Sequence, residues 1–205
     1  MTEPVPDRLM LFLFIQRYFV RFVIGAVLAA IVCGVIGVYT TFRREQRIAQ
    51  KIEAFGGTVE WQYDGPDWIP KAAQERLRFL HRIEYVGLRH FVSDWHGNYA
   101  GEKTTKVVPL DLLGDIGTLS SLKELFAKYT DIDDAGLKRL SQLPEIEELD
   151  LEGTKVTDRG LEHLKSMRRL KYLILAETGV SENGRDSLKA ALPGCDIQLE
   201  RFLAG

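Results

Sequence analysis

The chain has 205 residues, two cysteines and a formal net charge of −2, with 45% hydrophobic and 27% charged residues, a composition typical of folded proteins. The first 42 residues hold three arginines and two acidic residues, so the remainder carries 24 basic and 27 acidic side chains. Its net charge of −3 argues against nucleic acid as a partner. Cys33 lies inside an apolar segment far from Cys195, which excludes a disulfide framework.

The first predicted element is an apolar segment near the amino terminus. Residues 22–42 are 21 residues without a charge, and at about 1.5 Å per residue such a helix spans the ~30 Å hydrocarbon core of a bilayer. Arginines flank it at Arg17, Arg21, Arg43 and Arg44, which favours a transmembrane helix over a buried core helix. Its end lacks a small-residue cleavage site, so we expect it to be retained. The sequence therefore predicts a single-pass protein of the cell membrane.

Residues 1–21 form a tail before this segment. The apolar run at 9–15 is too short to cross a bilayer and is expected to lie in the membrane interface. Positive charges on the two sides of 22–42 are nearly balanced, and the short tail favours an inside amino terminus with the domain on the extracytoplasmic side. Small residues at every fourth position predict a face for homo-association, although such residues are common in any membrane helix: Gly25, Ala29, Cys33 and Gly37.

Residues 43–82 are predicted to form a membrane-proximal helix and an N-terminal cap. The pattern indicates a helix over 43–55, a stop at Gly56 and Gly57, a strand near 58–63 and a helix near 68–81. The aromatic residues of this part are expected to close the core at the end of the domain: Trp61, Tyr63 and Trp68.

Residues 119–197 repeat with a period of 24. Segments aligned from Leu122, Ile146 and Leu170 share apolar columns of the form L-x-x-L-x-L. Such columns predict short parallel strands that stack into one continuous core, so no single unit folds alone. The columns are Leu122/Ile146/Leu170, Leu125/Leu149/Leu173, Ala127/Leu151/Leu175 and Ile132/Val156/Val180.

Polar columns accompany the apolar ones. A threonine column is expected to bond to buried loop backbone: Thr130, Thr154 and Thr178. Each unit then shows a helix start, with a capping residue followed by an acid: Asp133-Asp134, Thr157-Asp158 and Ser181-Glu182. Because the capping oxygen accepts from free amides and the carboxylate complements the helix dipole, we expect these acids to be structural.

The unit GTKVTDRGLEHLKSMRRLKYL and the closing LKAALPGCDI resemble a bacterial family of membrane-anchored leucine-rich-repeat proteins. The upstream stretch RREQRIAQKIEAFGGTVEWQYDGPDW is similar to the helix, Gly-Gly, strand and Pro-x-Trp segment that precede the repeats in that family. The resemblance implies an α/β leucine-rich-repeat solenoid over 119–197 with an α/β N-terminal cap, followed by a tail at 198–205. It implies a binding scaffold and no catalytic residues.

The first unit, 83–118, departs from the repeat. Ile83, Val86 and Leu88 fit a strand, but Phe91 stands in the threonine column, and the spacing from Leu88 to Leu125 is 37 instead of 24. Either the unit carries a 13-residue insertion, or an irregular extra unit intervenes. We favour an insertion within 90–111.

The sequence contains no phosphate-binding loop, Cys-x-x-Cys pair, His-Glu-x-x-His helix or nucleophile elbow, and we expect a non-enzymatic protein without metal or cofactor. The alternative is a metal-dependent protein or enzyme that uses His90, Asp94 and His96, with His81 nearby, although their spacing matches no known metal motif. Trp95, inside the insertion, suits an exposed binding role or packing equally. Cys195 is expected to be a buried small apolar group.

Outward-facing strand positions are predicted to form a concave binding face for an unknown protein or peptide. The middle unit is acidic throughout, while lysines in the flanking units also suit a salt-bridge ladder. The predicted face comprises Lys123, Glu124, Phe126, Lys128, Glu147, Glu148, Asp150, Glu152, Lys171, Tyr172, Ile174 and Ala176. The predicted function is a membrane-tethered leucine-rich-repeat module for protein–protein interaction; the alternatives are the metal-dependent protein and a purely self-associating scaffold.

Overall fold

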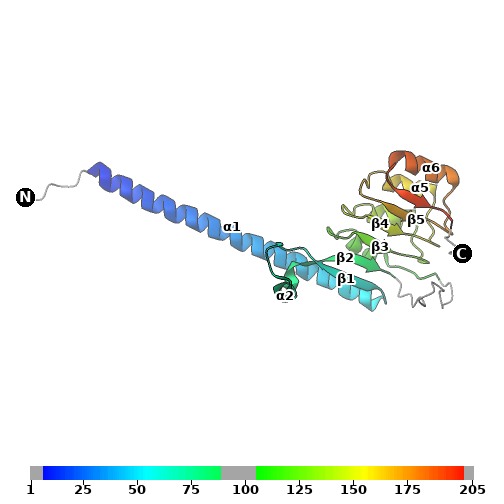
Figure 1. Ribbon diagram of the computed structural model, residues 1–205, viewed down its shortest axis with the longest axis horizontal. Coiled ribbons are helices and arrows are strands. Elements are labelled where there is room, and N and C mark those ends of the chain that lie inside the picture. The colour runs from blue at the N-terminus through cyan, green and yellow to red at the C-terminus, as the bar shows by residue number, and fades with distance from the viewer. Residues whose placement is uncertain (1–6, 89–104, 201–205) are drawn as a thin grey trace, which may run out of the picture. The chain divides into compact units, whose positions relative to one another are not determined.

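The structure is a computed structural model that describes residues 7–88 and 105–200 (Figure 1). The chain divides into two compact units, Met1–Phe42 and Arg43–Gly205, and each is described by itself. The described residues form a mixed α/β structure with one long apolar N-terminal helix and a six-stranded sheet, in which β2 to β6 run parallel.

Helix α1 (Asp7–Ala54) is continuous over 48 residues. The stretches predicted from the sequence as an interfacial run, a transmembrane helix and a membrane-proximal helix all lie within this one helix. No proline interrupts the stretch, and single glycines weaken a helix without breaking it. By length and composition, the part from Arg21 onward meets the requirements of a membrane span, and a signal sequence near an amino terminus meets them too.

Helix α1 ends at the two glycines that the sequence indicated. Gly56 has a φ of +81°, a left-handed conformation that glycine adopts without strain. The amide of Gly57 donates to the Ile52 carbonyl at 2.8 Å, and a Cβ on Gly57 would lie 2.5 Å from the Gly87 oxygen. This turn carries the chain back along Ile48 and Ile52, which are buried in the core of the second unit.

Strand β1 (Thr58–Tyr63) pairs antiparallel with β2 (His81–Gly87), and the register runs from Thr58 opposite Gly87 to Tyr63 opposite His81. The helix predicted near 68–81 is wrong. Only a four-residue helix, α2 (Lys71–Gln74), and a 3-10 turn, η1 (Arg78–Leu80), lie between the strands. The Asp64 amide bonds to the Leu80 carbonyl at 2.9 Å, so the chain reverses too tightly for a long helix.

The parallel part of the sheet continues with β3 (Glu124–Phe126), β4 (Glu148–Asp150), β5 (Tyr172–Ile174) and β6 (Asp196–Gln198) in chain order (Figure 1). Neighbouring strands pair residues that are 24 positions apart from Leu125 onward. One row crosses the whole parallel sheet and points into the core: Val86, Leu125, Leu149, Leu173 and Ile197. The 24-residue register predicted from the sequence is confirmed for β3, β4 and β5.

The first unit is registered differently from the sequence count. Strand β2 pairs directly with β3, and Val86 rather than Leu88 lies opposite Leu125, a separation of 39 residues. The excess over the 24-residue period is therefore 15 residues and not 13. Lys106 forms an isolated parallel bridge with Thr130, which places it in the threonine column. Residues 89–104, with most of the predicted insertion, lie outside the described residues.

Short helices follow the strands and bury leucines against the sheet: α3 (Leu110–Ile116), α4 (Asp134–Leu140), α5 (Asp158–Leu161), which continues as the 3-10 turn η2 (Glu162–Leu164), and α6 (Glu182–Ala191). Figure 1 shows α5 and α6 beside β4 and β5. The predicted helix caps are confirmed, because the side chains of Asp133, Thr157 and Ser181 accept from the backbone amides of Gly136, Arg159 and Gly184.

The threonine column is confirmed as a loop-bonding column. The hydroxyls of Thr130, Thr154 and Thr178 each donate to the backbone carbonyl three residues earlier, at 2.7, 2.7 and 2.6 Å. The structure adds a contact that the sequence did not reveal. Asp134 accepts from the Thr157 amide and hydroxyl at 2.8 and 2.7 Å, and Asp158 accepts from both groups of Ser181 at 2.7 Å. These carboxylates therefore join consecutive units.

Candidate interaction surface on the strand face

Side chains of a strand alternate between the two faces of its sheet, so the rows on either side of the core row point away from the core. We call this surface the strand face. One row consists of Tyr85, Glu124, Glu148, Tyr172 and Asp196, and the other of Gly87, Phe126, Asp150, Ile174 and Gln198. Tyr85 was not predicted to belong to this surface; it does so because it lies opposite Glu124 in the register of β2 and β3.

Exposed ion pairs lie near the amino-terminal ends of the strands. The Lys123 ammonium lies 2.5 Å from the Glu84 carboxylate, and Lys171 lies 2.5 Å from Glu147. The salt-bridge ladder considered from the sequence is present for Lys171 and Glu147, whereas Lys123 pairs with Glu84 of β2. The hydrogen bond from Lys171 lowers the pKa of Glu147. Exposed pairs of this kind contribute about 0–1 kcal/mol each.

A buried network occupies the other end of the strands. The Lys128 ammonium lies 2.9 Å from Asp150 Oδ2 and 3.1 Å from Glu152 Oε2, and the Tyr129 hydroxyl donates to Glu152 Oε1 at 2.6 Å. Burial by itself would lower the pKa of Lys128, but the two carboxylates outweigh it and the pKa is raised. Burial raises the pKa of Asp150, and Lys128 offsets part of that effect. The Lys128 ammonium therefore pairs with both Asp150 and Glu152.

This network corrects the predicted binding face. Asp150 and Glu152 were expected to be exposed residues of the acidic strand, but they are 0% and 3% exposed. Ala176, also expected on the surface, is buried as well. The reason is that Lys128 and Tyr129 of the preceding unit fold over the two carboxylates. These acids stabilise the contact between units and are closed to a partner.

Glu124 and Glu148 differ from the other acids of the strand face. They lie opposite each other in β3 and β4 and are half-buried, and neither forms an ion pair within 4.0 Å with another residue that the structure describes. Burial raises the pKa of Glu148, and the nearby charges of Glu124 and Asp150 raise it further. Two adjacent carboxylates repel each other, and a cationic group placed between them would relieve that repulsion.

Aromatic and aliphatic side chains surround these two carboxylates. The rings of Tyr85 and Phe126 lie 5.4 Å apart between centroids, Tyr172 is 52% exposed, and Ile174 is half-buried. Acidic groups between aromatic side chains suit a partner that presents lysine or arginine next to apolar residues, because the aromatic faces also attract cations. The arrangement combines negative charge with aromatic surface.

Other residues that the sequence singled out lie outside the described ranges or away from the strand face. His90, Asp94, Trp95 and His96 lie outside the described residues. Within the described ranges, no three His, Cys, Asp or Glu side chains are grouped so as to hold a metal ion. Cys195 is 1% exposed, and burial raises its pKa to about 11, in keeping with a packing role.

The small residues of α1 proposed for self-association are exposed in the N-terminal unit. They are Gly25, Ala29, Cys33 and Gly37. A Cβ added at Gly25 or Gly37 would meet no described atom within 4 Å. Exposure is a requirement for such a contact and does not by itself indicate one.

No protein-family model matches the chain, and no curated protein matches it. Among solved structures, it is similar to a leucine-rich-repeat protein of Leptospira interrogans, at 17% sequence identity and a TM-score of 0.34. The match covers 47% of this chain and 29% of that protein, so the chain spans less than a third of its length.

Proposed function

We propose that this protein is a membrane-tethered leucine-rich-repeat module that holds a basic protein or peptide on its strand face. The 24-residue period and the matching strand register support a short solenoid, in which each unit stacks on the one before. The uncharged stretch of α1 supports a retained membrane span. The predicted interaction face is retained in reduced form, without Asp150, Glu152 and Ala176.

The observation that carries this proposal is the pair formed by Glu124 and Glu148. The other acids assigned to this surface, Glu147, Asp150 and Glu152, are satisfied by lysines of the chain. Glu124 and Glu148 instead remain side by side, at a cost in electrostatic repulsion that folding alone does not require. A partner that supplies a lysine or arginine would gain two charge-assisted contacts at this position.

The test is selection of a displayed random-peptide library on the full chain in nanodiscs, followed by affinity measurements on the enriched peptides. We expect enrichment of lysine or arginine next to aromatic residues. The double variant Glu124→Gln/Glu148→Gln should bind these peptides at least about tenfold more weakly, because hydrogen bonds to a charged group contribute roughly 1.5–3 kcal/mol each.

The matched control is Glu162→Gln/Glu182→Gln, which removes two exposed acids from the helices. This variant should bind as the wild type does, since its total charge equals that of the test variant and only the position differs. Equal loss in both variants would mean that binding follows net charge, and no loss in either would remove the site from the strand face.

A further inference from the structure

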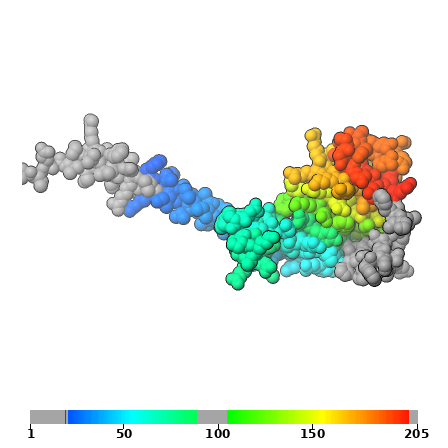
Figure 2. Space-filling model, in the orientation of Figure 1, coloured from blue at the N-terminus to red at the C-terminus, as the bar shows by residue number. Residues whose placement is uncertain are grey.

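Among the residues that the structure describes, Trp68 is the most exposed large apolar side chain outside α1, at 81%. It belongs to residues 64–80, called here the 64–80 segment, which joins β1 to β2. The sequence analysis placed Trp68 in the core together with Trp61, but only Trp61 packs against the core. Phe79 of the same segment is 38% exposed. In Figure 2 this part of the chain, coloured teal, forms a lobe on the surface of its unit.

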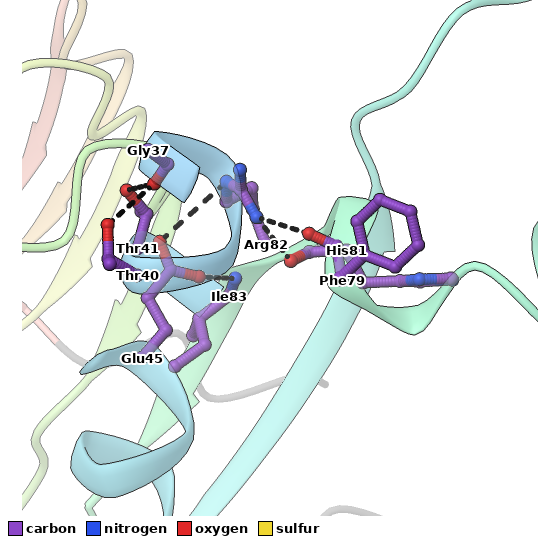
Figure 3. Close-up of polar contacts among 8 residues, drawn as sticks. All are labelled: Gly37, Thr40, Thr41, Glu45, Phe79, His81, Arg82 and Ile83. Atoms are coloured by element: carbon purple, nitrogen blue, oxygen red, sulfur yellow. Dashed lines mark hydrogen bonds and ion pairs between the residues drawn. The ribbon is translucent and has the colours of Figure 1, made fainter. Parts of the chain in front are cut away.

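The base of the 64–80 segment is fixed to α1 by a buried carboxylate. Glu45 is 3% exposed, its Oε2 accepts from the Ile83 amide at 3.2 Å, and its Oε1 lies 4.0 Å from Arg82 Nε (Figure 3). Arg82 in turn donates to the carbonyls of Phe79 and His81 at 3.1 and 3.0 Å. Burial raises the pKa of Glu45, against the opposing effects of the Ile83 amide and the arginines.

This anchor limits how far the segment lies from the apolar part of the chain. Glu45 follows Phe42, the last residue of the uncharged stretch, by three positions, which span at most about 10 Å even when fully extended. Trp68 follows Asp64, whose amide bonds to Leu80 at the base of the segment, by four positions, or at most about 14 Å. Short covalent connections and the Glu45 anchor therefore link Trp68 to the end of the uncharged stretch.

We propose that the 64–80 segment docks into the interfacial layer of the bilayer that the chain spans, with Trp68 as its anchor. The inference rests on the proposed membrane span. Tryptophan favours this layer because its ring is apolar and its N–H needs a polar partner. An open groove of about 490 Å³ lies beside Trp68, and Tyr63, Ile69 and Lys71 are among the residues that line it. Docking at this second point would fix the inclination of the strand face to the membrane.

The charges of the segment indicate what holds it there. Three basic residues, Lys71, Arg76 and Arg78, are matched by three acidic ones, Asp64, Asp67 and Glu75. A balanced segment gains little from anionic lipids, so the aromatic and apolar side chains supply most of the affinity. Docking is therefore expected to persist at high salt and in vesicles of zwitterionic lipid.

The test uses tryptophan fluorescence of the full chain in phosphatidylcholine vesicles whose acyl chains carry bromine at different depths. The variant Trp61→Phe/Trp95→Phe leaves Trp68 as the single tryptophan, and the matched control Trp68→Phe/Trp95→Phe leaves Trp61. We expect bromine near the headgroups to quench Trp68 several times more strongly than Trp61, and deeper bromine to quench it less. Extraction of the vesicles with alkaline carbonate reports separately on the span.

Each outcome decides between the two proposals. Retention at alkaline pH with Trp68 quenched by shallow bromine supports docking. If the chain is retained but Trp68 is unaffected by bromine and quenched by acrylamide from the water, the docking proposal is wrong and the span stands. Trp68 protected from both quenchers would also overturn docking, because protein then covers the ring. Release of the chain at alkaline pH would overturn the span and the docking together.

Discussion

At the scale of single residues, neighbouring charges on one surface have different roles because they differ in burial. Lys171 and Glu147 form a pair whose side chains are 59% and 30% exposed, whereas Lys128 and Asp150 form one at 16% and 0%. Water screens the first pair, so it contributes little to stability. The second pair has little water to replace a lost partner, so the removal of one member should destabilise the fold strongly.

Replacing Lys128 with methionine should destabilise the protein by about 3–5 kcal/mol, because Asp150 and Glu152 would remain buried without a cation. Lys171→Met, the control, should change the free energy of unfolding by under about 1 kcal/mol. Thermal unfolding of the full chain in detergent, followed by circular dichroism, measures both. Equal melting temperatures for the two variants would contradict a structural role for the buried network.

Glu148→Gln tests the repulsion between Glu148 and Glu124. The pKa of Glu148 is raised in the folded state above its unfolded value of 4.5, so its ionisation disfavours folding. At neutral pH we expect the variant to be as stable as the wild type or slightly more stable, by under about 0.5 kcal/mol.

The pH dependence of this difference follows from the direction of the shift. As the pH falls from neutral through the raised folded pKa towards 4.5, the wild type takes up a proton on Glu148 and its disadvantage relative to the glutamine variant should disappear. Melting temperatures of both proteins from pH 7 to pH 4.5 measure the effect. If the stability of the wild type relative to Glu148→Gln increased as the pH rises, the raised pKa of Glu148 would be contradicted.

At the scale of elements, the units are joined by a polar ladder as well as by the leucine core. The acid that follows each helix cap accepts two hydrogen bonds from the cap of the next unit: Asp134 from Thr157, and Asp158 from Ser181. The hydroxyl that donates to the carboxylate of the preceding unit at the same time caps its own helix. Each Thr-Asp or Ser-acid pair in the repeat therefore connects helix initiation to stacking.

Asp134→Ala should destabilise the protein by about 1–3 kcal/mol, because it removes two hydrogen bonds to a carboxylate. Glu182 occupies the same position in the last helical unit, and its ion pair in the described residues is with Arg185 of its own helix. Glu182→Ala should therefore cost under about 0.5 kcal/mol. Chemical unfolding of the two variants compares them, and a larger loss for Glu182→Ala would contradict the ladder.

The ladder also explains the glycine in the T-D-x-G-L pattern. A Cβ on Gly160 would lie 2.4 Å from Asp134 Oδ1, so the inter-unit carboxylate occupies the space of a side chain. Gly160→Ala in a helix would ordinarily stabilise by about 0.5–1 kcal/mol. Here it should destabilise, and the loss should shrink when Asp134 is alanine too. A double-mutant cycle measures this coupling, and additive effects would contradict it.

At the scale of the whole molecule, the orientation of the proposed membrane span decides on which side of the bilayer the strand face lies. A binding partner has to be present on that same side. We propose, as expected from the sequence, that the amino terminus is inside, which would place the strand face on the extracytoplasmic side. Partners would then be extracellular or periplasmic proteins. Positive charges are nearly balanced on the two sides of residues 22–42, so membrane orientation is the property for which a direct measurement is most informative.

A reporter enzyme that folds only outside the cytoplasm, fused after Gly205, should be active. A fluorescent reporter that folds only in the cytoplasm, fused at the same position, should be dark. The opposite pair of results would place the strand face inside the cell. Both fusions use the full chain, so each serves as the expression control for the other.

The sequence by itself determined the repeating part of this protein. A 24-residue period of leucines, threonines and capping residues defines strand register, loop hydrogen bonds and helix starts, because these contacts recur at fixed chain separations. The length and the low polarity of the stretch at 22–42 also follow directly from the sequence. The ion pair of Lys171 with Glu147 was one of two alternatives predicted from the sequence, because these residues too recur at a fixed chain separation.

Only the tertiary structure decided which outward-facing residues are open to solvent. Asp150 and Glu148 both point away from the core row, yet Lys128 of the previous unit covers Asp150 and leaves Glu148 half-buried beside Glu124. Trp68 is exposed for a related reason, since the tight reversal at Asp64 and Leu80 leaves it no core to enter. Alternation along a strand specifies the direction of a side chain, whereas its burial depends on side chains that arrive from elsewhere in the chain.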